Sequence, residues 1–144
     1  MKKEVNILIA ESNKEHFDLM RTNLQEAGVH NEILHFADGQ QLLDFLFNPD
    51  TGPENQCRPQ ESMVLTELNL LNVDGLQILE RIKQDEQLKK MPVIILTTTD
   101  DQDTIDRCFS LKCSSYIIKP AESQEFEETI QSFARFLSVV ETLI

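Results

Sequence analysis

Polar residues that could bind phosphate or a metal ion follow four of the apolar runs in this 144-residue sequence. Glu11 and Ser12 come after the first run, Glu67 after the third, Thr97 after the fourth and Lys119 after the fifth. If these runs are strands of one parallel sheet, their carboxyl ends meet along a single edge, where ligands collect in open α/β sheets. Carboxylate and hydroxyl oxygens suit Mg²⁺, while a lysine and a threonine can hold phosphate oxygens. The sequence therefore predicts a cleft in which these five side chains come together.

Short apolar strands alternate with amphipathic helices five times along the chain. The expected strands cover residues 5–10, 30–36, 63–66, 93–96 and 115–118. The expected helices follow them: one that ends before Gly28, then 38–47, 74–83, 100–111, and one from residue 122 onward. Strands that alternate with helices in this way are typical of a doubly wound α/β fold, in which right-handed crossovers place helices on both faces of a parallel sheet.

Length and charge limit what this chain can do. We expect one domain over residues 1–144, with an exposed loop at 48–60 that contains three prolines and a glycine. The 25 acidic and 13 basic residues give a formal net charge of -12, which argues against nucleic acid and anionic membranes as partners. The three cysteines form no Cys-x-x-Cys pair, and no segment is long enough to span a bilayer or to act as a signal peptide. A reduced, cytoplasmic environment is expected.

Four motifs carry a resemblance to a known family. They are residues 7–13 (ILIAESN), 65–75 (LTELNLLNVDG), 92–98 (PVIILTT) and 116–120 (YIIKP). In this order and spacing, the chain resembles the receiver domain of bacterial two-component response regulators, and most closely the single-domain receivers that partner phytochrome-type histidine kinases. The resemblance implies a flavodoxin-like five-stranded sheet with strand order 2-1-3-4-5, and a signalling protein rather than an enzyme. It also implies a histidine kinase or another signalling protein as partner.

The resemblance assigns a metal site and a phosphoacceptor position. In the family, an acidic pair after the first strand serves Mg²⁺, and Glu11 and Ser12 occupy those positions here. Glu67 stands where the family has the aspartate that accepts phosphate from a kinase histidine. The backbone carbonyl of Asn69, two residues later, completes the implied metal shell.

Three further residues match the part of the family's site that responds to phosphate. Thr97 corresponds to the hydroxyl residue that hydrogen-bonds the phosphoryl group, and Tyr116 to the aromatic residue that reports the switched state. Lys119 corresponds to the lysine that pairs with the phosphoryl group. Leu71 replaces the proline that usually follows the acceptor.

Two departures act against phosphorylation. Glu67 is one methylene longer than aspartate, which displaces its carboxylate by about 1.5 Å, and misplacement by about 1 Å can cost on the order of a hundredfold in rate. Ser12 removes one carboxylate from the implied metal site, so we expect no bound cofactor and at most weak Mg²⁺ binding. We predict a pseudo-receiver that acts by protein–protein contact. The alternatives are a working receiver that takes phosphate on Glu67 and, more distantly, a flavodoxin-like nucleotide or flavin binder.

The carboxylate of Glu67 has two alternative placements. Near Lys119 and Thr97 it would lie where phosphoryl oxygens bind and would hold one switched state. Pointing to solvent, it would contribute only ~0–1 kcal/mol through any ion pair.

Several residues have simpler structural interpretations. Ser12 with Glu15 forms a Ser-x-x-Glu pattern, which predicts that Ser12 caps the first helix. Asp74 is expected to cap a helix or to form a turn. The three histidines share no motif and are expected on the surface or in the core: they are His16, His30 and His35.

The last helix carries more apolar surface than a single core-facing stripe requires. The stripe is formed by Phe126, Ile130, Phe133, Leu137 and Val140. Beyond it lie Phe136, Val139, Leu143 and Ile144. This excess predicts a homodimer through the C-terminal helix.

Overall fold

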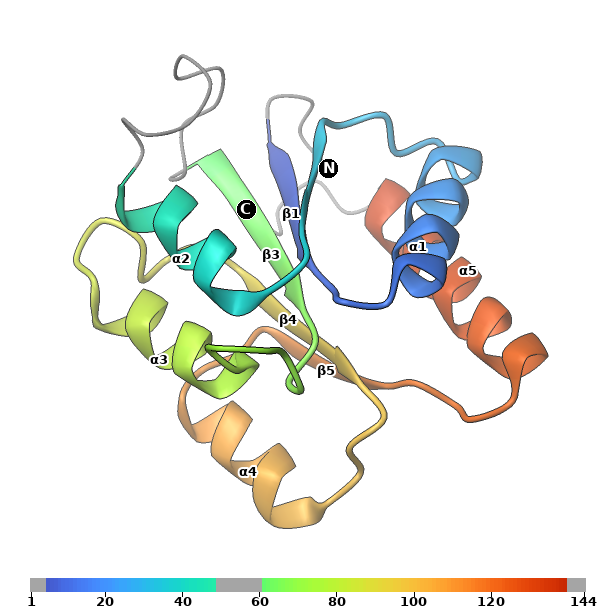
Figure 1. Ribbon diagram of the computed structural model, residues 1–144. Helices are drawn as coiled ribbons and strands as arrows, with labels where there is room; N and C mark the ends of the chain where they lie inside the picture. The colour runs from blue at the N-terminus through green and yellow to red at the C-terminus, as the bar shows by residue number, and fades with distance from the viewer. Residues whose placement is uncertain (1–4, 49–60, 140–144) are drawn as a thin grey trace.

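A computed structural model describes residues 5–48 and 61–139, so all of the expected loop except Asn48 lies outside the described residues. Five parallel strands form one sheet in the order β2-β1-β3-β4-β5, as predicted. Helices α1 and α5 cover one face of the sheet, and α2, α3 and α4 cover the other (Figure 1). The strands are β1 (Asn6–Ala10), β2 (Ile33–Phe36), β3 (Ser62–Thr66), β4 (Val93–Thr97) and β5 (Ser115–Ile118). The helices are α1 (Lys14–Glu26), α2 (Gly39–Phe47), α3 (Gly75–Gln84), α4 (Gln102–Ser110) and α5 (Ser123–Val139).

The central strands are buried on both faces, which explains why they are apolar without alternation. In β1, Ile7 and Ile9 pack with α1 and α5, whereas Leu8 and Ala10 point to the opposite layer with α2 and α3. Strands β3 and β4 divide their side chains between the two layers in the same way. The sheet therefore joins two apolar cores and holds its strand ends in fixed positions.

The register of the sheet aligns the ends of its strands. Ala10 pairs with Thr66 across β1 and β3, and Thr97 pairs with Ile118 across β4 and β5. The ladder continues one residue further, because the Glu67 amide donates to the Ala10 carbonyl (3.0 Å) and the Lys119 amide to the Thr97 carbonyl (2.7 Å). Residues that directly follow these strands therefore lie along one edge.

The first helix begins one residue later than predicted. Asn13, not Ser12, is the N-cap: its side-chain Oδ1 accepts from the His16 amide at 3.1 Å. The prediction that Ser12 forms a capping box with Glu15 is wrong. Both residue types are good N-caps, and here the carboxylate of Glu11 accepts from the Asn13 amide at 3.1 Å, which directs the chain into the helix at Asn13.

The other predicted helix boundaries lie within two residues of those in the structure; the largest difference is at the start of α4, predicted at residue 100 and found at Gln102. Asp74 forms a complete capping box with Gln77 at the start of α3. Gly28 follows α1 with a φ of 95°, the left-handed conformation expected of a residue just past a helix. Within the described ranges, no helix is long and apolar enough to cross a membrane.

Candidate functional site

The ammonium group of Lys119 lies at the centre of the predicted cleft. It donates a short hydrogen bond to Oε1 of Glu11, and Oε1 of Glu67 lies 3.6 Å from its Nζ atom. The Nδ1 atom of His16 lies 3.2 Å from the same nitrogen. All but a small fraction of the Lys119 and Glu11 side chains is buried. The structure therefore brings Glu11, Glu67 and Lys119 together as predicted, and it adds His16.

The carboxylate of Glu67 turns inward, toward Lys119. Its side chain is only 10% exposed, and its Oε2 atom accepts from the Leu68 amide at 3.0 Å. The alternative in which Glu67 points to solvent is therefore wrong. The other alternative placed Glu67 near both Lys119 and Thr97. Glu67 contacts Lys119, but within the described residues no hydrogen bond joins it to Thr97.

Glu11 is held by backbone and side-chain contacts on several sides. Besides Lys119, its carboxylate accepts from the Asn13 amide, and its carbonyl lies 2.8 Å from Nε2 of His35. Because a carbonyl can only accept, Nε2 of His35 must carry the proton. The His35 ring stacks on Phe17 at a centroid distance of 3.8 Å. These contacts fix the position of the Glu11 carboxylate.

A second group of polar side chains surrounds Thr99. The hydroxyl of Tyr116 donates to the Thr99 carbonyl at 2.7 Å, and the Asn69 amide nitrogen lies 3.3 Å from the Thr99 hydroxyl. The hydroxyl of Thr97, which is fully buried, lies 3.4 Å from that of Thr99. Thr97, Tyr116 and Asn69 are thus connected through Thr99. The sequence offered a signal for this residue, because a spacing of two places Thr97 and Thr99 on the same side of an extended chain.

Burial has a clear effect on Tyr116. It raises the pKa of the Tyr116 phenol to about 12, with smaller contributions from Cys108 and from carboxylates that include Glu67. The phenol therefore stays protonated at neutral pH and remains a hydrogen-bond donor to Thr99.

The loop after Glu67 packs tightly against two helix starts. A Cβ atom at Gly75 would lie 2.6 Å from the Glu67 carbonyl, so only glycine allows α3 to begin this close to the acceptor position. A Cβ atom at Gly39 would lie 1.8 Å from the Val73 carbonyl. Leu71, in the same loop, is 72% exposed. The loop therefore has a fixed backbone and presents one apolar side chain to solvent.

The oxygen atoms at this edge of the sheet are of the type that a hard divalent cation binds. Glu11 and Glu67 offer carboxylates, Asn69 a backbone carbonyl, and the exposed Ser12 a hydroxyl, and oxygen ligands of this kind suit Mg²⁺. A cation held there would supply positive charge to oxygens bound beside it. The ammonium of Lys119 already contacts both carboxylates. No three His, Cys, Asp or Glu side chains within the described ranges form a group that could hold a metal.

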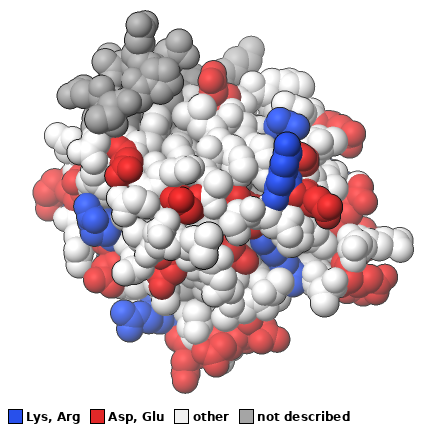
Figure 2. All heavy atoms as spheres, in the orientation of Figure 1, with Lys and Arg blue, Asp and Glu red and all other residues white. Residues whose placement is uncertain are grey.

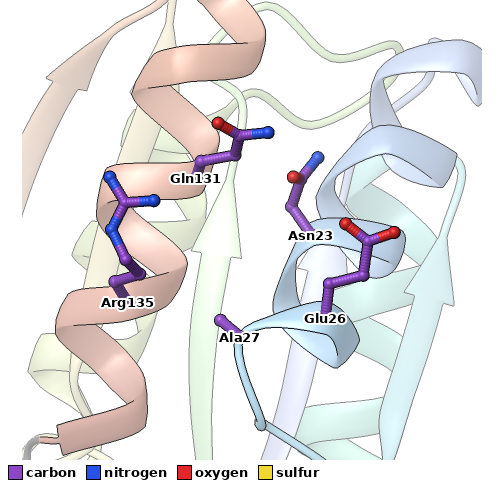
Figure 3. A pocket seen from close by; sticks show the side chains of 5 residues that line it. All are labelled: Asn23, Glu26, Ala27, Gln131 and Arg135. Atoms are coloured by element: carbon purple, nitrogen blue, oxygen red, sulfur yellow. The ribbon is translucent and has the colours of Figure 1, made fainter.

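A cavity of about 420 Å³ lies between the last turn of α1 and the middle of α5 (Figure 3). It is lined by Asn23, Glu26, Ala27, Gln131 and Arg135. In Figure 3 the Gln131 side chain extends from α5 toward α1, whereas the Asn23 amide lies along α1, where it donates to the Leu19 carbonyl. The cavity shares no residue with the cleft at Lys119, and it identifies the flank of α5 that faces α1.

Comparison with known proteins agrees with this geometry. A "Probable methanogenesis regulatory protein FilR2" of Methanothrix harundinacea is 32% identical over 130 residues, which cover 90% of this chain and 81% of that protein. The Mn(2+)-bound form of response regulator Rcp1, a Synechocystis protein, superposes with a TM-score of 0.86 at 29% identity, over 97% of this chain and 99% of that one. The phosphorylated cyanobacterial phytochrome response regulator RcpA superposes with a TM-score of 0.81 at 29% identity, over 96% and 97%.

The family itself is identified from the sequence. Residues 7–131 match the family described as "Response regulator receiver domain", and this range contains every predicted site residue. The similarity to Rcp1 agrees with the predicted likeness to phytochrome-associated receivers. The chain therefore belongs to the response regulator receiver domain family of two-component signalling.

Proposed function

We propose that this protein is a pseudo-receiver: a receiver that signals by protein–protein contact and takes phosphate poorly or not at all at Glu67. One observation carries the proposal. Lys119, the residue expected to pair with a phosphoryl group, already contacts the carboxylates of Glu11 and Glu67. The Glu67 carboxylate is turned inward and accepts from the Leu68 amide, which supports the proposal that it takes the place of an incoming anion beside Lys119.

The charge of the cleft supports the same proposal. Two carboxylates and one ammonium leave a net charge of -1 around Lys119 when His16 is neutral. An incoming phosphoryl donor carries about two negative charges into this cleft. Because Ser12 replaces the second acid, we expect the cleft to bind a divalent cation more weakly, so that less of that repulsion is offset. Ser12 is therefore as important to the proposal as Glu67.

Intact-mass spectrometry after incubation with acetyl phosphate and Mg²⁺ tests the proposal. We expect no phosphoryl adduct on the wild-type protein, little on Glu67→Asp, and clear labelling of the double variant Ser12→Asp/Glu67→Asp. The double variant restores both the acceptor geometry and the second acid. Equal labelling of the single and double variants would show that Ser12 does not limit phosphorylation.

The second candidate is a working receiver that takes phosphate on Glu67. It is favoured by the similarity to RcpA, which has been observed phosphorylated, and to Rcp1, which has been observed with Mn²⁺. A hydroxylamine-sensitive adduct on the wild-type protein, lost in Glu67→Gln, would favour this candidate and exclude the pseudo-receiver.

For partners, we propose a histidine kinase or another signalling protein, and a second copy of this chain. On α5, Phe136 is 55% exposed and Val139 is 75% exposed. Gln131 lies on the flank that faces α1, and five residues further along the helix Phe136 is rotated by ~140° from it. Phe136 therefore lies on the flank turned away from α1. Val140, Leu143 and Ile144 of the predicted apolar set lie outside the described residues.

Two neighbouring elements extend this apolar flank. Ile118, at the end of the edge strand β5, is 44% exposed, and Phe109 of α4 is 50% exposed. Arg107 pairs with Glu80 of α3 at 3.9 Å, and Phe109, two residues later, lies ~200° around the helix from it. The exposed side chains of α4, β5 and α5 thus border the same open edge of the sheet.

Light scattering coupled to size exclusion tests the dimer. We expect a dimer for the wild-type chain and for Gln131→Ser, which alters the opposite flank of α5. We expect a monomer for Phe136→Ser, because it removes an exposed aromatic side chain from the proposed contact. A wild-type monomer at high concentration would contradict the dimer.

The surface charge supports protein partners over nucleic acid. Acidic side chains outnumber basic ones across the visible face, and a group of them lies over the end of α4 (Figure 2). That end carries Asp101 as N-cap and Asp103 in the first turn. A surface of this charge repels a phosphate backbone, and we propose that the protein acts in the cytoplasm without binding nucleic acid or membrane.

A further inference from the structure

His16 lies in the first turn of α1 and contacts the same ammonium as the two carboxylates. Its Nδ1 atom is 3.2 Å from Nζ of Lys119 and 3.9 Å from Oε1 of Glu11. A lysine ammonium has three N–H donors and no acceptor. Glu11 and His16 accept two hydrogen bonds, and the remaining N–H group has the Glu67 carboxylate at 3.6 Å. Lys119 thus makes two hydrogen bonds, to Glu11 and His16, and an ion pair with Glu67.

This contact determines the protonation state of the imidazole. Because an ammonium cannot accept, Nδ1 of His16 must carry a lone pair, and the ring proton must be on Nε2. Burial lowers the pKa of His16, and the Lys119 charge lowers it further, although Glu11 and Glu67 act in the opposite direction. The contact with Lys119 itself requires the neutral ring, because a protonated imidazole has no lone pair to accept from an ammonium.

The imidazole also contacts an aromatic ring of α5. Its ring centroid lies 4.7 Å from that of Phe126, a buried residue of α5. The Nζ atom of Lys119 lies 5.9 Å from the same phenyl ring. Phe126 is thus close to both groups, and α5 holds the imidazole against the end of β5.

We infer that His16 is a positioning residue that holds the Lys119 ammonium beside Glu11 and Glu67. It accepts a hydrogen bond from an N–H group of Lys119 that would otherwise be available to an incoming anion. The residue acts through Lys119 and transfers no proton. The position of His16 beside Lys119 follows from the contacts alone. Only the consequence that Lys119 is kept from binding phosphate rests on the proposed pseudo-receiver function.

Two substitutions separate the acceptor atom of His16 from its ring. His16→Asn keeps an acceptor, because the Oδ1 atom of asparagine occupies the place of Nδ1. His16→Phe keeps an aromatic ring against Phe126 and removes the acceptor. The readout is trace acetylation of lysines by acetic anhydride, with site occupancies measured by peptide mass spectrometry. Lys14 is exposed on the same helix and serves as the internal reference.

We expect Lys119 to be protected in the wild-type protein and in His16→Asn. In His16→Phe its reactivity relative to Lys14 should rise by on the order of tenfold, since one hydrogen bond to a charged group has about that effect. A purely structural role for the ring would leave His16→Phe protected and expose Lys119 in His16→Asn. That pattern, or equal protection in all three proteins, would overturn the inference.

A measurement on the unaltered protein avoids any question of folding. Nitrogen-15 NMR of the His16 ring at neutral pH should show a protonated Nε2 and an unprotonated Nδ1. A proton on Nδ1 would overturn the inference. Acetyl phosphate labelling of the same sample separates the two proposals. If an adduct forms while Lys119 stays protected and Nε2 stays protonated, the pseudo-receiver is refuted and the role of His16 still stands.

Discussion

Glu67 and Lys119 follow strands that are not neighbours, because β4 lies between β3 and β5, yet their charged groups are 3.6 Å apart. Strands are spaced by about 4.8 Å, so the two chain positions are separated by roughly 10 Å. A long lysine side chain and a glutamate that is one methylene longer than aspartate together cover that distance. The lengths of both side chains therefore allow Glu67 and Lys119 to meet across the strand that lies between them.

Glu67→Gln should destabilise the protein. The substitution keeps the size of the side chain and removes the charge beside a buried ammonium, for which we expect a loss of about 1–3 kcal/mol in the free energy of unfolding. Urea unfolding measures it. The control is Glu86→Gln, because Glu86 pairs with Lys89 at 2.9 Å but is 85% exposed, and such a pair contributes only ~0–1 kcal/mol. A gain in stability would instead mean that repulsion between Glu67 and Glu11 exceeds the attraction to Lys119.

Ser12→Asp should strengthen the binding of divalent cations. It adds a carboxylate beside Glu11, and we expect Mg²⁺ to bind on the order of tenfold more tightly, equivalent to about 1.4 kcal/mol. Isothermal titration calorimetry on both proteins gives the ratio. Ser12→Asn has a side chain of the same shape without the charge and should resemble the wild type. Equal affinities for all three would place the cation away from Ser12.

The start of α1 can be tested with two adjacent alanine substitutions. Asn13→Ala removes the side chain that accepts from the His16 amide, and loss of an N-cap costs about 1 kcal/mol. Ser12→Ala should change the free energy of unfolding by less than ~0.5 kcal/mol, as is usual for an exposed residue that caps nothing. Denaturant unfolding of both variants makes the comparison. A larger loss of unfolding free energy for Ser12→Ala than for Asn13→Ala would instead support the capping role predicted for Ser12.

The sequence was sufficient for the α/β fold class and for most of the cleft because both depend on local patterns, whereas the strand order was implied by the family resemblance. Apolar runs of strand length predict buried parallel strands, and the ends of such strands share one edge, so Glu11, Glu67 and Lys119 could be placed together. His16 could not be placed in this way. His16 reaches Lys119 because Phe126 of α5 supports its ring, and a contact between residues 110 positions apart leaves no local pattern.

The choice between two adjacent N-caps also depends on a contact that the sequence does not display. Ser12 and Asn13 are both suitable residue types. The Glu11 carboxylate, held by Lys119, accepts from the Asn13 amide, so the helix start is set by a side chain from the other end of the chain. The wrong N-cap and the unpredicted His16 contact thus both lie next to the buried pair of Glu11 and Lys119.

Tyr116 allows a direct spectroscopic test of its surroundings, because it is the single tyrosine of the chain. Ultraviolet absorbance during an alkaline titration should show the phenol ionising near pH 12 in the folded protein and near pH 10 in urea. Tyr116→Phe removes the donor to the Thr99 carbonyl and should cost about 0.5–1.5 kcal/mol. A folded-state transition near pH 10 would show that the phenol is accessible to solvent and leaves its partner easily.

Cys113 predicts a loss of stability at moderately alkaline pH. Burial raises the pKa of its thiol to about 11 from an ordinary value of 9.0, with a further contribution from Cys108. Between these two pH values the unfolded chain has lost a proton that the folded protein keeps, so the free energy of unfolding must fall as pH rises from about 9 to about 11. Cys113→Ala removes this group and should flatten that part of the profile, although it lowers stability at neutral pH by removing a packed side chain. Urea unfolding at a series of pH values compares the two slopes, and parallel profiles would mean that the Cys113 thiol ionises as readily in the folded protein as in the unfolded chain.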